Sequence, residues 1–156
     1  MSDFFKDLET KIEEGWDSFK KDVTKEADKV KAETKKLYDE AKDKIDDAGD
    51  KVKDKAHQAG EDAKKKADEL AAKADDAVDK AEETVKAKVA DAKADLKAEG
   101  DKVKTDATDD LNKAKADLDA AEKKVDEKVE EIKGDIAKDV DEAKAKIDGK
   151  ENEAKK

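Results

Sequence analysis

The chain has 156 residues, of which 54% are charged and 35% are hydrophobic, and its mean hydropathy is −1.20. A globular domain has roughly 25% charged and 45–50% apolar residues, so this composition excludes an ordinary globular fold with a large core. The formal net charge of −10 and a basic set made only of lysine argue against nucleic acid as a partner, and the lack of cysteine excludes disulfides and thiolate metal sites.

Residues 1–47 form the first expected element, an amphipathic helix that contains all five aromatic residues of the chain. From Phe5 onward, apolar side chains recur at steps of three and four residues, which is typical of one helix face. Each large side chain buried on an apolar surface contributes about 1.5–3 kcal/mol. We therefore predict that the bulkiest ridge docks on a lipid or protein surface, and the alternative is a core for partner helices. The ridge comprises Phe4, Phe5, Leu8, Ile12, Trp16, Phe19 and Val23.

Residues 48–147 form the second expected element, a helical region rich in alanine, lysine and aspartate. The apolar residues keep this spacing in units of eleven residues, or three helical turns, so the apolar face stays almost straight along the helix. We call this face the apolar stripe. It comprises Phe5, Leu8, Ile12, Trp16, Phe19, Val23, Ala27, Val30, Thr34, Tyr38, Ala41, Ile45, Ala48, Val52, Ala56, Ala59, Ala63, Ala67, Leu70, Ala74, Val78, Ala81, Val85, Val89, Ala92, Leu96, Gly100, Val103, Ala107, Leu111, Ala114, Leu118, Ala121, Val125, Val129, Ile132, Ile136, Val140, Ala143 and Ile147.

The apolar stripe shifts phase at 41–48 and at 114–121, where the unit is seven residues long. These are the natural places for a bend, and the pattern leaves open whether the helix continues or folds back there. Residues 148–156 do not continue this apolar spacing, so the helix is expected to fray there. Most stripe positions of the second element are alanines, whose methyl groups contribute only about 0.8 kcal/mol each. We therefore expect an all-α chain without a compact core, with incomplete helix formation and disorder in water.

Lysines border the apolar stripe in residues 48–118, while the far side of the helix carries acids and alanines. Lysine stems can lie along an apolar surface while the ammonium groups reach phosphate or water, as in interfacial helices. The alternative is an ordinary solvated face. The predicted interfacial lysines are Lys51, Lys53, Lys55, Lys64, Lys66, Lys73, Lys86 and Lys88.

Catalytic chemistry is not expected. His57 is the one histidine, it lies on the polar side of the helix, and no base–nucleophile pair accompanies it. Residues 43–54 resemble a calcium loop only faintly, because Ile45 stands at the third position and no glutamate closes the loop. We predict no enzyme activity, no metal site and no cofactor.

The segments KDKAHQAGEDAKKKADE (53–69) and AAKADDAVDKAEETVKAKV (71–89) resemble group 3 late embryogenesis abundant proteins. That resemblance, over roughly residues 48–147, implies a chain that becomes helical on drying or at membranes and protects membranes and proteins against water loss. The aspartate excess, the missing arginine and the aromatic N-terminal part depart from the family pattern. The eleven-residue repeat is also similar to that of synucleins and exchangeable apolipoproteins.

The expected function is therefore protection against desiccation or other stress by coating membranes or client proteins. One alternative is a coat of lipid droplets or storage granules, and another is a structural rod or coiled-coil bundle. Expected partners are a lipid surface, client proteins and further copies of the chain. No signal peptide or transmembrane segment is recognised, so we expect a cytoplasmic, peripherally bound protein.

Overall fold

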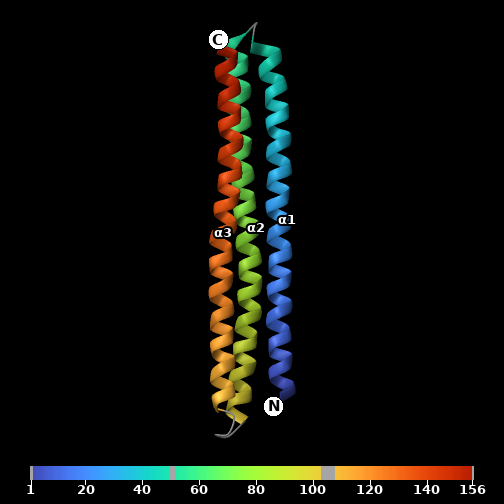
Figure 1. The fold of residues 1–156 in the computed structure, drawn as a ribbon, viewed down its shortest axis with the longest axis vertical. Coiled ribbons are helices and arrows are strands. Elements are labelled where there is room, and N and C mark those ends of the chain that lie inside the picture. Colours follow the sequence, from blue (N-terminus) through green and yellow to red (C-terminus); the bar gives the residue numbers. More distant parts are fainter. Residues whose placement is uncertain (1, 50–51, 103–107, 156) are drawn as a thin grey trace. The chain divides into compact units, whose positions relative to one another are not determined.

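The computed structural model describes residues 2–49, 52–102 and 108–155. They form three helices, α1 (Ser2–Gly49), α2 (Lys53–Lys102) and α3 (Thr108–Lys155), which are labelled in Figure 1. Within the described ranges every residue except Val52 is helical and no strand occurs, so the all-α prediction is confirmed. Continuous helix agrees with a sequence that has no proline and abundant alanine, lysine and glutamate.

The connection between α1 and α2 comes directly after the first predicted phase shift, 41–48, because α1 ends at Gly49. The amide of Val52 donates to the carbonyl of Ala48 at 2.8 Å, and the carbonyl of Val52 accepts from the amides of Lys55 and Ala56 at 3.1 and 3.3 Å. These bonds satisfy backbone groups that helix ends would otherwise leave unpaired.

The second predicted phase shift, 114–121, lies inside α3 and does not interrupt it. Its seven-residue step keeps Ala114 and Leu118 on the buried face, so the helix has no need to break there. Residues 148–155, which were expected to fray, are also helical. Glu151 is buried in this segment, and Lys150 Nζ lies 2.9 Å from Asp46 Oδ1 of α1.

The chain divides into two compact units, each built from one segment of every helix. Unit 1 contains residues 1–23 and 78–131. Lys86 of α2 lies beside Asp126 of α3, and Lys93 lies beside Asp119, so the two segments run antiparallel. The buried hydrophobic residues of unit 1 are Leu8, Phe19, Val23, Val78, Val85, Val89, Ala92, Leu96, Ala114, Leu118, Val125 and Val129.

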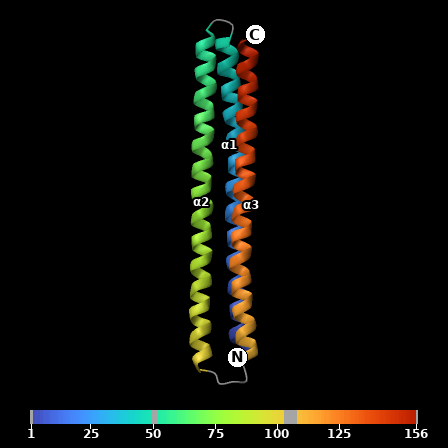
Figure 2. The ribbon, with the colours of Figure 1, turned by 90° about the vertical axis from the view of Figure 1, so that its left-hand side faces the viewer.

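Unit 2 contains residues 24–77 and 132–156. Lys64 pairs with Asp148, and Asp68 pairs with Lys144, so α2 and α3 run antiparallel here too, side by side in both views (Figure 2). The buried hydrophobic residues of unit 2 are Val30, Ala41, Ile45, Ala56, Ala63, Ala67, Ala74, Ile132, Ile136, Val140, Ala143 and Ile147.

The expectation of a chain without a compact core is wrong, because the apolar stripes of the three segments cover one another in each unit. Among the described side chains, all the buried hydrophobic ones lie on the apolar stripe. Thr34, a polar stripe position, is buried as well, and its hydroxyl donates to the carbonyl of Lys31 at 3.0 Å. That local bond removes most of the cost of burying a hydroxyl group.

Candidate functional site

The ridge predicted to dock on a surface belongs to unit 1, where three of its seven side chains are buried. Leu8, Phe19 and Val23 are at most 5% exposed, whereas Ile12 and Trp16 are half-buried. The Trp16 and Phe19 rings stack with centroids 5.7 Å apart, and Lys20 Nζ lies 5.1 Å from the Trp16 ring centroid. Phe4 and Phe5, both half-buried, pack edge to face with centroids 5.5 Å apart. The packing with α2 and α3 agrees with the alternative of a helix-bundle core, and docking on lipid stays a prediction.

Shallow grooves run between the helices of unit 1 beside this ridge. One groove of about 400 Å³ has Ile12 and Trp16 on one side and Val85 and Val125 on the other. Such grooves between packed helices show that the ridge is only partly covered. They are open clefts with charged rims, without the enclosed space that sequesters a small-molecule substrate.

The predicted interfacial lysines divide into two groups. Lys53, Lys55, Lys66, Lys73 and Lys88 have exposed side chains, and Lys51 lies outside the described residues. Lys64 and Lys86 of α2 instead form ion pairs with α3, and these contacts were not predicted from the sequence.

Lys86 of α2 lies 2.9 Å from Glu82 Oε1 and 2.6 Å from Asp126 Oδ1 of α3. Lys64 contacts Asp148 of α3 and lies 2.7 Å from Glu61 Oε1. Hydrogen bonds to the facing carboxylates, Asp148 and Asp126 first, raise the pKa of both lysine ammonium groups well above the usual range. The hydrogen bond from Lys64 correspondingly holds the pKa of the Glu61 carboxyl below its usual range.

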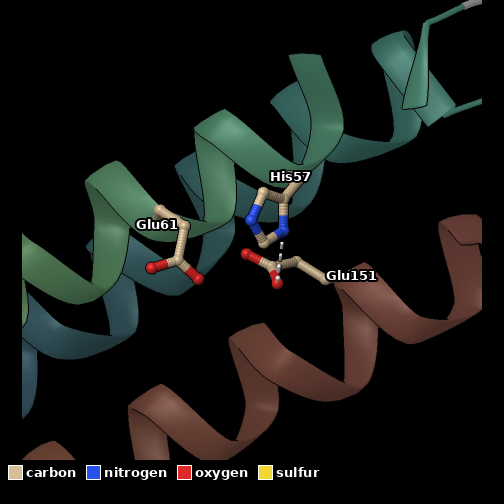
Figure 3. A group of neighbouring side chains, drawn as sticks. All are labelled: His57, Glu61 and Glu151. Atoms are coloured by element: carbon tan, nitrogen blue, oxygen red, sulfur yellow. Dashed lines mark ion pairs between the residues drawn. The ribbon is translucent and has the colours of Figure 1, made fainter. Parts of the chain in front are cut away.

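A cluster that the sequence reasoning missed lies in unit 2, where His57 and Glu61 of α2 meet Glu151 of α3 (Figure 3). One ligand atom from each side chain lies within 4.8 Å of the other two. His57 Nδ1 is 3.6 Å from Glu151 Oε2. The four-residue spacing of His57 and Glu61 is visible in the sequence, but the approach of Glu151 exists only in the folded unit.

Along the described parts of the chain, no helix has an apolar stretch long enough to cross a bilayer. No family model matches the sequence, and comparison with curated proteins and with solved structures finds no match either.

Proposed function

We propose that the protein is a non-enzymatic coat for apolar surfaces, chiefly lipid surfaces, that acts when water becomes scarce. The observation that carries this proposal is that every buried hydrophobic side chain of the described residues lies on the apolar stripe. In each unit, the apolar face of one helix segment therefore covers the apolar faces of the other segments. The same face is available to lipid when the helix segments separate. Client proteins with exposed apolar patches are partners of the same chemistry.

Separation of α2 from its neighbours costs less in unit 2 than in unit 1. The buried hydrophobic residues that α2 contributes to unit 2 are all alanines, namely Ala56, Ala63, Ala67 and Ala74. Each methyl group removed from water contributes only about 0.8 kcal/mol, and a lipid surface restores that contribution. The exchange of helix contacts for lipid contacts is therefore nearly balanced, and a modest change of conditions can shift it.

Water loss acts on the charged faces as well. The ion pairs between helices, such as Lys86 with Asp126, are solvent-exposed and weak in bulk water. As water is withdrawn, unpaired backbone and charged groups become more costly, and internal pairing strengthens. Helix formation is thus favoured both on an apolar surface and in the dry state, which supports a role in desiccation or related stress.

A structural helical bundle is the second candidate function, favoured by the contacts between helices in each unit. A lipid-droplet or granule coat would use the same apolar stripe as the first proposal, with a permanent surface in place of a conditional one.

Circular dichroism and Trp16 fluorescence with and without lipid vesicles test the proposal. We expect the Trp16 emission to shift to shorter wavelengths on vesicles, because this half-buried ring moves into an apolar layer. Val89→Asp places a charge on the apolar stripe and should weaken vesicle binding at least about tenfold. Ala87→Asp places the same charge on the exposed opposite face and should leave binding unchanged.

Unchanged Trp16 emission, together with a cooperative and concentration-dependent melt in buffer, would reject the coat and support the structural bundle. Dried films provide a further arm of the experiment, in which helix content should be at least as high as in buffer.

A further inference from the structure

We infer that His57, Glu61 and Glu151 form a binding site for a divalent transition-metal ion of the Zn²⁺ class, which ties α2 to α3 within unit 2. This inference is independent of the proposed coat function. It starts from the geometry of the cluster, in which a helix presents two ligands one turn apart and a second helix supplies the third (Figure 3).

The separations are within reach of metal coordination. Zinc binds imidazole nitrogen and carboxylate oxygen at about 2.0–2.2 Å, which places neighbouring ligand atoms roughly 3–3.5 Å apart. The three ligand atoms already lie within 4.8 Å of one another. The side chains of His57 and Glu61 are 52% and 49% exposed, so both can rotate by the small amount that is needed.

An independent observation at Glu151 points to a cation. Its side chain is only 5% exposed, and its Oε1 atom is buried with no hydrogen-bond partner. The other oxygen, Oε2, lies 3.6 Å from His57 Nδ1 and 3.8 Å from Lys64 Nζ, both beyond hydrogen-bonding distance. A buried carboxylate with such loose compensation is costly, and a divalent ion would supply a closer positive charge and a partner for Oε1.

Gly60 leaves room for the Glu151 carboxylate against α2. A Cβ atom at this position would lie 1.5 Å from Glu151 Oε1 and 2.2 Å from its Cδ, so any larger residue must displace the carboxylate. The missing side chain of Gly60 therefore lets the α3 glutamate lie against α2, one turn from His57.

Lys64 is the competing cation of the cluster. Its Nζ atom lies 2.7 Å from Glu61 Oε1, so a metal ion must draw this carboxylate away from the ammonium group. Lys64 keeps Asp148 of α3 as a partner when Glu61 turns to the metal. The cluster should hence bind metal moderately, and removal of the lysine charge should strengthen binding.

The donor set selects the class of metal. One imidazole and two carboxylates suit Zn²⁺ and neighbouring transition ions, with water in the remaining position. Calcium and magnesium prefer sites in which all ligands are oxygen atoms, so they are disfavoured here.

Isothermal titration of the full chain with ZnCl₂, in a buffer that does not bind zinc, tests the site. We expect one ion per chain, and visible absorption bands when Co²⁺ replaces zinc. His57→Asn and Glu151→Gln should each weaken binding at least tenfold. Glu153→Gln changes an exposed carboxylate on the same helix and should leave the titration unchanged.

Two further variants separate the metal site from folding. Gly60→Ala should weaken zinc binding at least tenfold while circular dichroism shows helix content equal to or above that of the wild type, since alanine is the better helix former. Lys64→Gln should tighten zinc binding. A wild-type chain that binds no zinc would overturn the inference, and so would diffuse binding at several sites that Glu151→Gln leaves unaffected.

Discussion

Units 1 and 2 differ in the side chains that fill their cores. Among the described residues each unit buries twelve hydrophobic side chains, of which two are alanines in unit 1 and six are alanines in unit 2. In unit 1, α2 buries three valines, a leucine and one alanine, whereas the hydrophobic side chains that it buries in unit 2 are all alanines. The larger side chains remove more apolar area from water, so unit 1 has the stronger apolar core.

Unit 2 packs its helices around small side chains. Ile45 of α1 and Ile147 of α3 pack with the small residues Ala56 and Ala63 of α2 in one cluster. Charged contacts between α2 and α3 line this unit, including Lys64 with Asp148 and Lys144 with Asp68. Solvent-exposed pairs contribute about 0–1 kcal/mol each, so they do not replace the missing apolar area. We therefore expect unit 2 to open more easily than unit 1.

Phe19 is the bulkiest fully buried side chain of unit 1, so its truncation should destabilise the protein most. Phe19→Ala should lower the free energy of unfolding by about 3–5 kcal/mol, because it removes a ring and leaves a cavity. Urea unfolding followed by circular dichroism measures this loss. Ser18→Ala, at the exposed neighbouring position, should change stability by less than about 0.5 kcal/mol, and equal losses for the two variants would contradict the packing of unit 1.

A smaller difference is expected between the units themselves. Amide hydrogens in the unit 2 segment of α2, residues 53–77, should exchange about tenfold faster or more than those in the unit 1 segment, residues 78–102, because they are held by fewer large side chains. Hydrogen exchange with mass spectrometry of the intact chain measures both segments at once. Uniform exchange along α2 would show that the difference in core composition does not control opening.

The smallest effect concerns Lys86, which joins α2 to α3 in unit 1. Its raised pKa means that the pair contributes stability in full below pH 10.5, the ordinary lysine value, and loses it as the pH rises through the folded-state value. Lys86→Met should lower the free energy of unfolding by about 0.5 kcal/mol at pH 7 and should reduce the loss of stability at strongly alkaline pH.

Thermal melts at pH 7 and at strongly alkaline pH check this sign. Lys88→Met, at an exposed lysine of the same helix, is the matched control and should follow the wild type at both values. A wild-type protein that gained stability at alkaline pH would contradict the assignment of this pair.

The sequence predicts burial better than it predicts what covers the buried face. Steps of three and four residues identify Phe19, Val89 and Ile147 as one face, and all three are buried. The pattern cannot distinguish a lipid surface from a neighbouring helix, since either one accepts the same side chains. The stripe contains every buried hydrophobic side chain of the described residues, but the expectation of no compact core was wrong because neighbouring helices cover these side chains.

The residues of the candidate sites could not be identified from the sequence alone, because their partners come from another helix. Lys64 and Lys86 look like border lysines when a single helix is considered, and only the packing of α3 brings Asp148 and Asp126 to them. Glu151 lies four residues after Ile147, so it continues the buried face beyond the last apolar position. Its meeting with His57 depends on an antiparallel register that no local pattern specifies.

We propose that the apolar stripe covers neighbouring helices in buffer and is exchanged for lipid when a surface is present. The chain has no cysteine, so Ala72→Cys on α2 and Ala137→Cys on α3, both exposed in unit 2, allow two spin labels to be attached at chosen sites. This exchange should give a single short distance between the labels in buffer and a clearly longer one on vesicles. The same short distance in both conditions, with the protein bound to the vesicles, would contradict it.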